Sequence, residues 1–235
     1  MDLGGKILKK TRIPTRRILS TALILFTFIA ANVSYAAESG LTVEQILDRV
    51  EKHYTGKSFM ADFIQESTIK AMDIVDSASG KIFVRYPGMM RWEYEKPEKQ
   101  TIITDGHKLW IHRPADNQVL TGSAPAFFSD GKGASFLSDI KLVRQKFKIS
   151  LENSKQGFLH ELMLEPMEKK LDVTKIRLSV TKNTFTVNRV VTYNTYGDEN
   201  RIEFINHQFN IKLDDSLFSF EIPPGADVLK IDEGK

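Results

Sequence analysis

The stretch Gly80–Pro114 decides the fold of this chain, and it reads GKIFVRYPGMMRWEYEKPEKQTIITDGHKLWIHRP. Four short runs rich in apolar residues are joined by three compact turns, and both tryptophans of the chain, Trp92 and Trp110, fall within it. Met90, Trp92 and Tyr94 alternate with mostly charged residues. A period of two is typical of a half-buried antiparallel strand, so these three side chains are expected on the inside of a curved sheet.

The rest of the chain repeats this strand pattern. Short runs rich in Val, Ile, Phe and Thr are separated by Gly, Asn, Asp or Lys turns, which is typical of an antiparallel sandwich or barrel. The polar segment 71–79 is predicted to be a loop, and no linker divides the chain, so a single domain is expected. The predicted strands cover residues 58–70, 81–86, 89–95, 101–104, 108–112, 147–152, 159–165, 175–181, 186–194 and 201–208. An ordered edge segment with Leu217, Phe218 and Phe220 is expected before Pro223-Pro224.

One helix is expected before the first strand. Thr42 and Gln45 fit a capping box, apolar residues follow at helical spacing, and Gly56 is a natural end for the helix. Two roles remain open for this helix. It is either a fixed cover of the core or a mobile cover over a binding site.

Residues 1–36 have the features of a secretory signal peptide. They contain six Lys or Arg residues, an apolar run over residues 18–31 and small residues around Ala36. We expect cleavage after Ala36, which leaves residues 37–235 as a domain free in the exported compartment. The chain has no cysteine, so neither a lipid-modified cysteine nor a disulfide is expected. Cleavage leaves 27 basic and 29 acidic residues, a balance that does not favour nucleic-acid binding.

Segment 122–139 lacks strand alternation and is long for a plain connection. Three interpretations remain open. The segment is a lid or binding loop with exposed phenylalanines, a docking surface for a partner, or a segment whose aromatic side chains pack into the nearest edge of the core. The candidate lid residues are Phe127, Phe128, Phe136 and Leu137.

The sequence offers no recognisable catalytic or metal-binding motif. Its five histidines fall in five separate segments, without the close pairing usual for zinc, and neither a P-loop nor a nucleophile elbow occurs. No catalytic residue, metal or cofactor is therefore assigned. Phenylalanine is abundant, with 15 residues. A curved sheet with an aromatic inner side, closed by helices, suits a hydrophobic ligand such as an acyl chain.

A set of short motifs occurs in order along nearly the whole of residues 37–235. These motifs are Ala61–Gln65, Gly80, Tyr86-Pro87-Gly88, Arg91-Trp92, Asp105-Gly106, Leu109-Trp110, Phe218-Ser219-Phe220, Pro223-Pro224-Gly225 and Val228. Each one alone is a weak signal, but the ordered set is fairly specific. In this order they resemble the periplasmic outer-membrane lipoprotein carrier proteins, the LolA family.

The resemblance implies an incomplete, half-open antiparallel β-barrel that is closed by a few short helices over an apolar cavity. It also implies a carrier without enzymatic activity. Such a carrier takes triacylated lipoproteins from an inner-membrane ABC transporter and passes them to an outer-membrane acceptor, either a receptor lipoprotein or the membrane itself. A soluble monomer in the periplasm of a Gram-negative cell is expected. The expected ligand-cavity residues are Phe63, Ile82, Val84, Met90, Trp92, Tyr94 and Trp110.

One position departs from the family pattern. The family commonly has an arginine immediately before the proline of the turn, where it contacts the lid, but here Tyr86 precedes Pro87 and the arginine is Arg85. Because a shift of one residue along a strand reverses the face, we expect Arg85 to point outward and Tyr86 to make the lid contact. Without a charge that contact is weaker, so a looser lid is predicted. Two other functions remain open: a related half-barrel module that binds lipids or senses the envelope, and an exported hydrolase.

Overall fold

The computed structural model describes residues 40–125, 140–153, 156–168 and 173–231. Within them one sheet of twelve strands is accompanied by the helices α1 (Val43–Tyr54) and α3 (Ile140–Lys146) and by the 3-10 helices η1 (Pro114–Asp116) and η3 (Asp215–Phe218). The strands are β1 (Ser58–Ile69), β2 (Ile74–Arg85), β3 (Met89–Lys96), β4 (Gln100–Asp105), β5 (Lys108–Arg113), β6 (Gln118–Ser123), β7 (Phe147–Glu152), β8 (Leu159–Pro166), β9 (Val173–Thr181), β10 (Val187–Asn194), β11 (Glu199–Phe209) and β12 (Asp227–Lys230).

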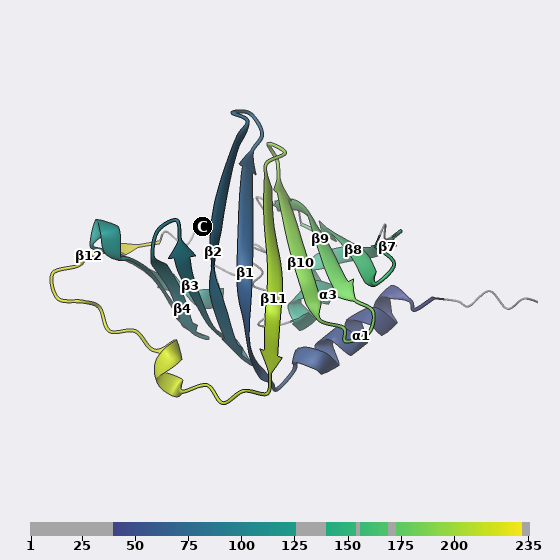
Figure 1. Ribbon diagram of the computed structural model, residues 1–235, viewed down its shortest axis with the longest axis horizontal. Helices are drawn as coiled ribbons and strands as arrows, with labels where there is room; N and C mark the ends of the chain where they lie inside the picture. Colours follow the sequence, from purple (N-terminus) through teal and green to yellow (C-terminus); the bar gives the residue numbers. More distant parts are fainter. Residues whose placement is uncertain (1–39, 126–139, 154–155, 169–172, 232–235) are drawn as a thin grey trace, which may run out of the picture. The chain divides into compact units, whose positions relative to one another are not determined.

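The strands follow the order β12-β6-β5-β4-β3-β2-β1-β11-β10-β9-β8-β7 across the sheet. Neighbouring strands run antiparallel, except that β12 runs parallel to β6. The terminal strands β12 and β7 do not pair with each other among the described residues, so the sheet is not closed into a barrel. The prediction of a mainly β fold with an incomplete antiparallel barrel and a few helices is confirmed (Figure 1).

Helix α1 begins and ends where the sequence predicts. The Thr42 hydroxyl accepts a hydrogen bond from the Gln45 N–H, and the Gln45 side chain accepts one from the Thr42 N–H, so the capping box is complete. Gly56 follows with a φ of 72°, a conformation that glycine adopts at no steric cost. No helix among the described residues is long and apolar enough to cross a bilayer. The buried residues of α1 share one face and are Ile46, Leu47, Val50 and Tyr54.

The two faces of the sheet are covered by different parts of the chain. We call the face that carries Phe63 and Trp92 the inner face, and there α1 and α3 contribute to one buried apolar cluster. We call the opposite side the outer face. Over β3 and β4 it is covered by η3, within the segment that runs from β11 to β12 and is drawn in yellow (Figure 1). Phe218 of η3 is buried there.

The structure corrects the sequence-based prediction in three places. Residues 71–79 are not all loop, because β2 begins at Ile74 and pairs with β1 from there. The small and acidic residues of this segment have low strand propensity, and pairing with β1 outweighs it. The expected edge segment near Phe218 is η3 on the outer face, not an edge. Strands β6 and β12 were missed, and β12 forms one of the two edges of the sheet.

Candidate functional site

The apolar part of the inner face is packed. Phe63, Ile82, Val84, Met90 and Trp92 are each at most 3% exposed, and they form one cluster with the apolar side of α1. The rings of Phe63 and Trp92 meet edge-on, with centroids 5.0 Å apart. The structure thus brings together five of the residues predicted to line a ligand cavity. All five are buried side chains of that cluster.

Polar and aromatic contacts link α1 to the sheet and to α3. The Tyr54 hydroxyl accepts a 2.9 Å hydrogen bond from the Val187 N–H, and burial raises the pKa of Tyr54 well above its usual value. The His53 ring, one residue earlier, lies 4.3 Å from the Phe209 ring between centroids. Nearer its start, α1 is linked to α3 because Arg144 donates a 2.5 Å hydrogen bond to Asp48. Helix α1 is therefore docked through its apolar side and through several polar links, among them ion pairs of Arg144 with Glu44 and Asp48.

Tyr94 marks the end of the packed region. Its ring meets the Phe63 ring edge-on at 4.9 Å, while its hydroxyl donates a 2.9 Å hydrogen bond to Gln65 Oε1. Burial raises the pKa of Tyr94 to about 12, so the hydroxyl keeps its proton at neutral pH. Gln65 donates in turn to Asn200 at 2.8 Å. At Tyr94 the apolar core therefore gives way to a polar network.

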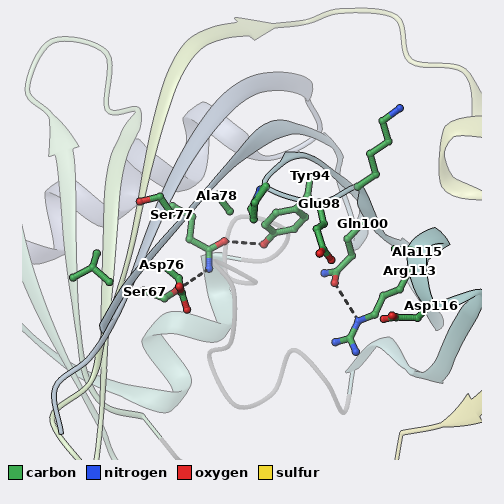
Figure 2. A pocket seen from close by; sticks show the side chains of 14 residues that line it. Ser67, Asp76, Ser77, Ala78, Tyr94, Glu98, Gln100, Arg113, Ala115 and Asp116 are labelled. Carbon is green, nitrogen blue, oxygen red and sulfur yellow. Dashed lines mark hydrogen bonds between the residues drawn. The ribbon is translucent and has the colours of Figure 1, made fainter. Parts of the chain in front are cut away.

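A pocket of about 910 Å³ lies beyond Tyr94 (Figure 2). Gln65 is two residues from Phe63 in β1, Tyr94 is two residues from Trp92 in β3, and Gln100 pairs with Tyr94. Their side chains therefore share the inner face, and the pocket continues that face past the core. It is lined by Gln65, Ser67 and Tyr94, by residues 75–78 and 97–100, and by Arg113, Ala115 and Asp116.

The lining of this pocket carries charges of both signs. Arg113 uses its Nε–H to donate a 3.3 Å hydrogen bond to Gln100 (Figure 2). Asp76, Glu98 and Asp116 also border the pocket, and none of these three carboxylates is in an ion pair within the described residues. The arrangement offers donors and acceptors to a polar ligand, whereas the neighbouring apolar surface is already buried.

Trp110 does not join the other predicted cavity residues. Trp92 pairs with Ile102, whereas Trp110 pairs with Ile103, the next residue of β4. Because successive residues of a strand point to opposite faces, the two tryptophans lie on opposite sides of the sheet. The Trp110 ring is 6.5 Å from the Phe220 ring, which follows η3. The prediction that Trp110 lines the inner face is therefore wrong.

Arg85 lies on the outer face beside η3. Its Nη1 is 2.5 Å from Asp215 Oδ1, and its guanidinium lies 4.8 Å from the centre of the Phe218 ring. Tyr86 is half-buried in the turn after β2, where its N–H donates a 3.2 Å hydrogen bond to the Lys57 carbonyl. Arg85 thus holds η3 against the sheet. The four candidate lid residues lie outside the described residues: Phe127, Phe128, Phe136 and Leu137.

Apart from Tyr94, the polar residues of the pocket were not singled out from the sequence. Two signals point to them. Pro97 has no N–H and follows the last residue of β3, Lys96, so β3 stops there. Gln65 is the next residue of β1 after Phe63 that points to the inner face, and an apolar residue at this position would extend the core. Within the part of the chain that the structure describes, no group of three or more His, Cys, Asp and Glu could hold a metal ion.

The amino-acid sequence matches known carrier proteins. The family model described as "Outer membrane lipoprotein carrier protein LolA" covers residues 55–221. An outer-membrane lipoprotein carrier protein of Chromobacterium violaceum is 32% identical over 176 residues, which are 75% of this chain and 82% of that protein. A protein of the same name from Coxiella burnetii is 28% identical over 218 residues, which are 92% of this chain and 99% of that protein.

A solved structure shares the fold. The crystal structure of an uncharacterized conserved protein from Thermus thermophilus has a TM-score of 0.53 with 16% identity, and the match covers 80% of this chain and 98% of that one. At this identity the likeness concerns the fold alone. The sequence match extends further, because residues 55–221 run from β1 through the whole pocket to η3 and beyond. This chain therefore belongs to the LolA family of outer membrane lipoprotein carrier proteins.

Proposed function

We propose that this chain binds the acyl chains of lipoproteins against its inner face and carries them from the inner to the outer membrane. Membership of the LolA family supports a role in lipoprotein sorting. The observation that carries the binding part is the apolar inner face, whose buried cluster includes one side of the amphipathic helix α1. In this proposal α1 is the mobile cover and the acyl chains take its place.

The energies of the two occupants are comparable. Helix α1 buries four apolar side chains, which at ~1.5–3 kcal/mol each amount to roughly 6–12 kcal/mol. One acyl chain of ~15 methylenes gains about 12 kcal/mol at ~0.8 kcal/mol per methylene. Three chains of one lipoprotein therefore gain more on leaving water than α1 loses on leaving the sheet.

The cellular setting of the proposal rests on the sequence motifs and not on the geometry. The chain would be exported with residues 1–36 removed, take triacylated lipoproteins from an inner-membrane ABC transporter, and pass them to an outer-membrane acceptor. The proposed activity is binding and release, without a covalent step. Tyr86 would contact the cover where the family commonly has an arginine, and the cover would be held more loosely as a result.

Release of a radiolabelled lipoprotein from spheroplasts tests this proposal directly. Purified residues 37–235 are expected to bring the lipoprotein into the supernatant as a one-to-one complex, and bound lipoprotein is expected in the mass spectrum of the complex. Folded protein that releases none, or that co-purifies with phospholipid only, contradicts the carrier function. In the same assay Tyr86→Phe is expected to change ligand retention, and unchanged retention and release would contradict the role of Tyr86.

A cross-link tests the movement of α1. The chain has no cysteine, so His53→Cys with Phe209→Cys introduces one pair, at positions whose rings lie 4.3 Å apart. Joined by a cleavable bismaleimide, this variant is expected not to take up lipoprotein, and cleavage of the linker is expected to restore uptake. The unlinked double variant is the matched control. Equal uptake with the linker intact would show that α1 does not need to move.

A further inference from the structure

The first half of β2 has an open edge. Strand β2 pairs with β1 along its whole length, from Ile74 opposite Ile69 onward, whereas β3 pairs only with residues 79–85 of β2. Residues 74–78 therefore have no second neighbouring strand among the described residues. In an antiparallel strand alternate residues direct their backbone N–H and C=O groups to opposite sides. About two or three of these residues thus direct both groups away from β1.

This open edge borders the polar pocket. Residues 75–78 line the pocket in succession, although their side chains alternate between the two faces of the sheet. A strand contributes consecutive residues in this way when it presents its edge and not one face. Residues 97–100 form the opposite wall, in the turn where β3 has ended. The pocket occupies the place in which the ladder between β2 and β3 would have continued (Figure 2).

We infer that this edge binds an extended polar polypeptide by strand addition, and that the occupant is the segment of the cargo lipoprotein that follows its acylated residue. The inference rests on the proposed function. An open edge presents unpaired donors and acceptors that an extended peptide can satisfy through its main chain. Five residues at ~3.3 Å per residue accommodate a segment about 16 Å long.

The lining favours a polar segment over an apolar one. Lys99 and Arg113 supply positive charge, and Asp76, Glu98 and Asp116 supply negative charge. An apolar strand would desolvate these groups without giving them hydrogen bonds, which is unfavourable. A segment rich in Ser and Asn offers donors and acceptors to both signs of charge.

Tyr94 joins the two parts of the proposed site. Its ring contacts Phe63 at the apolar face, and its hydroxyl bonds to Gln65 at the wall of the pocket. A ligand with acyl chains on the inner face therefore brings its attached polypeptide to the open edge of β2. Acyl chains and main chain would bind side by side, each to the surface that matches its chemistry.

Backbone methylation of a synthetic ligand tests the inference. The probe is a tripalmitoylated cysteine followed by six Ser and Asn residues, made in three forms: unmodified, N-methylated at tail positions 1, 3 and 5, and N-methylated at positions 2, 4 and 6. Binding to residues 37–235 is measured by competition. Because only alternate N–H groups face the edge, one methylated form is expected to bind about tenfold more weakly or worse, and the other within about twofold of the unmodified probe.

The outcomes separate the two proposals. Equal affinity of all three forms, or equal loss in both methylated forms, would overturn strand addition while leaving acyl-chain binding intact. No binding of the unmodified lipopeptide by folded protein would overturn the carrier function itself, and with it this inference. A large loss of affinity in one methylated form and not in the other supports both acyl-chain binding and strand addition.

A pair of proline variants provides the second measurement. Asp76 and Ser77 are neighbours, so the N–H of one faces β1 and the N–H of the other faces the pocket. The variants are Asp76→Pro and Ser77→Pro. The one that removes the N–H facing β1 breaks the ladder and lowers the melting temperature, whereas the one that removes the N–H facing the pocket is tolerated, as proline is on an edge strand. The tolerated variant is expected to bind two ligands with equal affinity: the unmodified lipopeptide and a tripalmitoylated cysteine amide that has no peptide tail. Affinity equal to that of the unsubstituted chain would overturn the inference.

Discussion

Tyr94 donates a 2.9 Å hydrogen bond to Gln65 across the inner face, while its ring packs edge-on against Phe63. One side chain therefore closes the apolar core and begins the polar pocket. The two functions of this residue can be separated, because removal of the hydroxyl leaves the ring in place.

Tyr94→Phe is expected to lower the free energy of unfolding by about 0.5–1.5 kcal/mol, since one hydrogen bond is lost and Gln65 Oε1 loses this donor. The measurement is urea denaturation followed by circular dichroism, with an unchanged m-value. Tyr196→Phe is the matched control, because the Tyr196 side chain is 83% exposed and its change is expected to be close to zero. Equal effects of the two substitutions would show that the bond to Gln65 contributes nothing.

Arg85→Ala is expected to loosen η3 and to lower the free energy of unfolding by about 1 kcal/mol, because the guanidinium lies over the buried Phe218 ring. Asp215→Asn is expected to change stability little, since the Asp215 carboxylate is 93% exposed and such ion pairs are screened by solvent. Hydrogen exchange of residues 214–220 reports the docking of η3. Faster exchange in Asp215→Asn than in Arg85→Ala would show that the ion pair with Asp215, and not the contact with the Phe218 ring, holds η3 in place.

Gly80→Ala is expected to destabilise the sheet by about 1–3 kcal/mol, as overpacking in a core does. A Cβ at this position would fall on the carbonyl oxygen of Glu93 in β3, and the Phe63 ring is also close. A backbone oxygen in a paired strand cannot move aside as a flexible side chain can. Gly157→Ala is the control, because a Cβ at Gly157 meets no described atom within 4 Å. Equal melting temperatures for the two variants would contradict the prediction.

Stability is expected to decrease as the pH falls below 6.5. Burial lowers the pKa of His53, His160 and His207 below the ordinary value of 6.5. Nearby cations add to the effect for two of them, Lys57 for His53 and Lys182 for His160. Between the lowered pKa values and 6.5 the unfolded chain binds more protons than the folded chain, so the free energy of unfolding rises with pH in this window. Above it this contribution is constant.

Melting temperatures between pH 8 and pH 5 check this expectation. The double substitution His53→Gln and His207→Gln is expected to flatten the dependence between pH 6.5 and pH 5, because two of the three groups no longer titrate. A melting temperature that rises as the pH falls from 6.5 would contradict the sign.

Local signals in the sequence predict local structure well. Helix α1 follows from Thr42 and Gln45, because the capping box satisfies backbone donors within four residues of chain. The strand containing Met90 and Trp92 follows from strict alternation, which needs no knowledge of its neighbours. Most strands of the open sheet were predicted for the same reason.

Features that depend on a distant partner were not predictable. Strand β2 begins at Ile74 because it pairs with β1 from there. The small and acidic residues of its first half have low strand propensity, so the local sequence does not predict it. The side of the sheet on which Trp110 lies depends on the registers of the β3–β4 and β4–β5 pairs. A shift of one residue in either register would place Trp110 on the opposite face. The polar pocket combines both effects, because it lies between the unpredicted part of β2 and the end of β3.

Strand β12 lies along β6 at the end of the sheet, and it returns there only after the chain has crossed the outer face through η3 (Figure 1). Four residue pairs hold it in place. A chain that ends before Asp227 would leave the backbone of β6 as a bare edge, and bare edges template pairing between molecules. Truncation before Asp227 is therefore expected to cause aggregation during purification and storage, before any change in the binding of cargo.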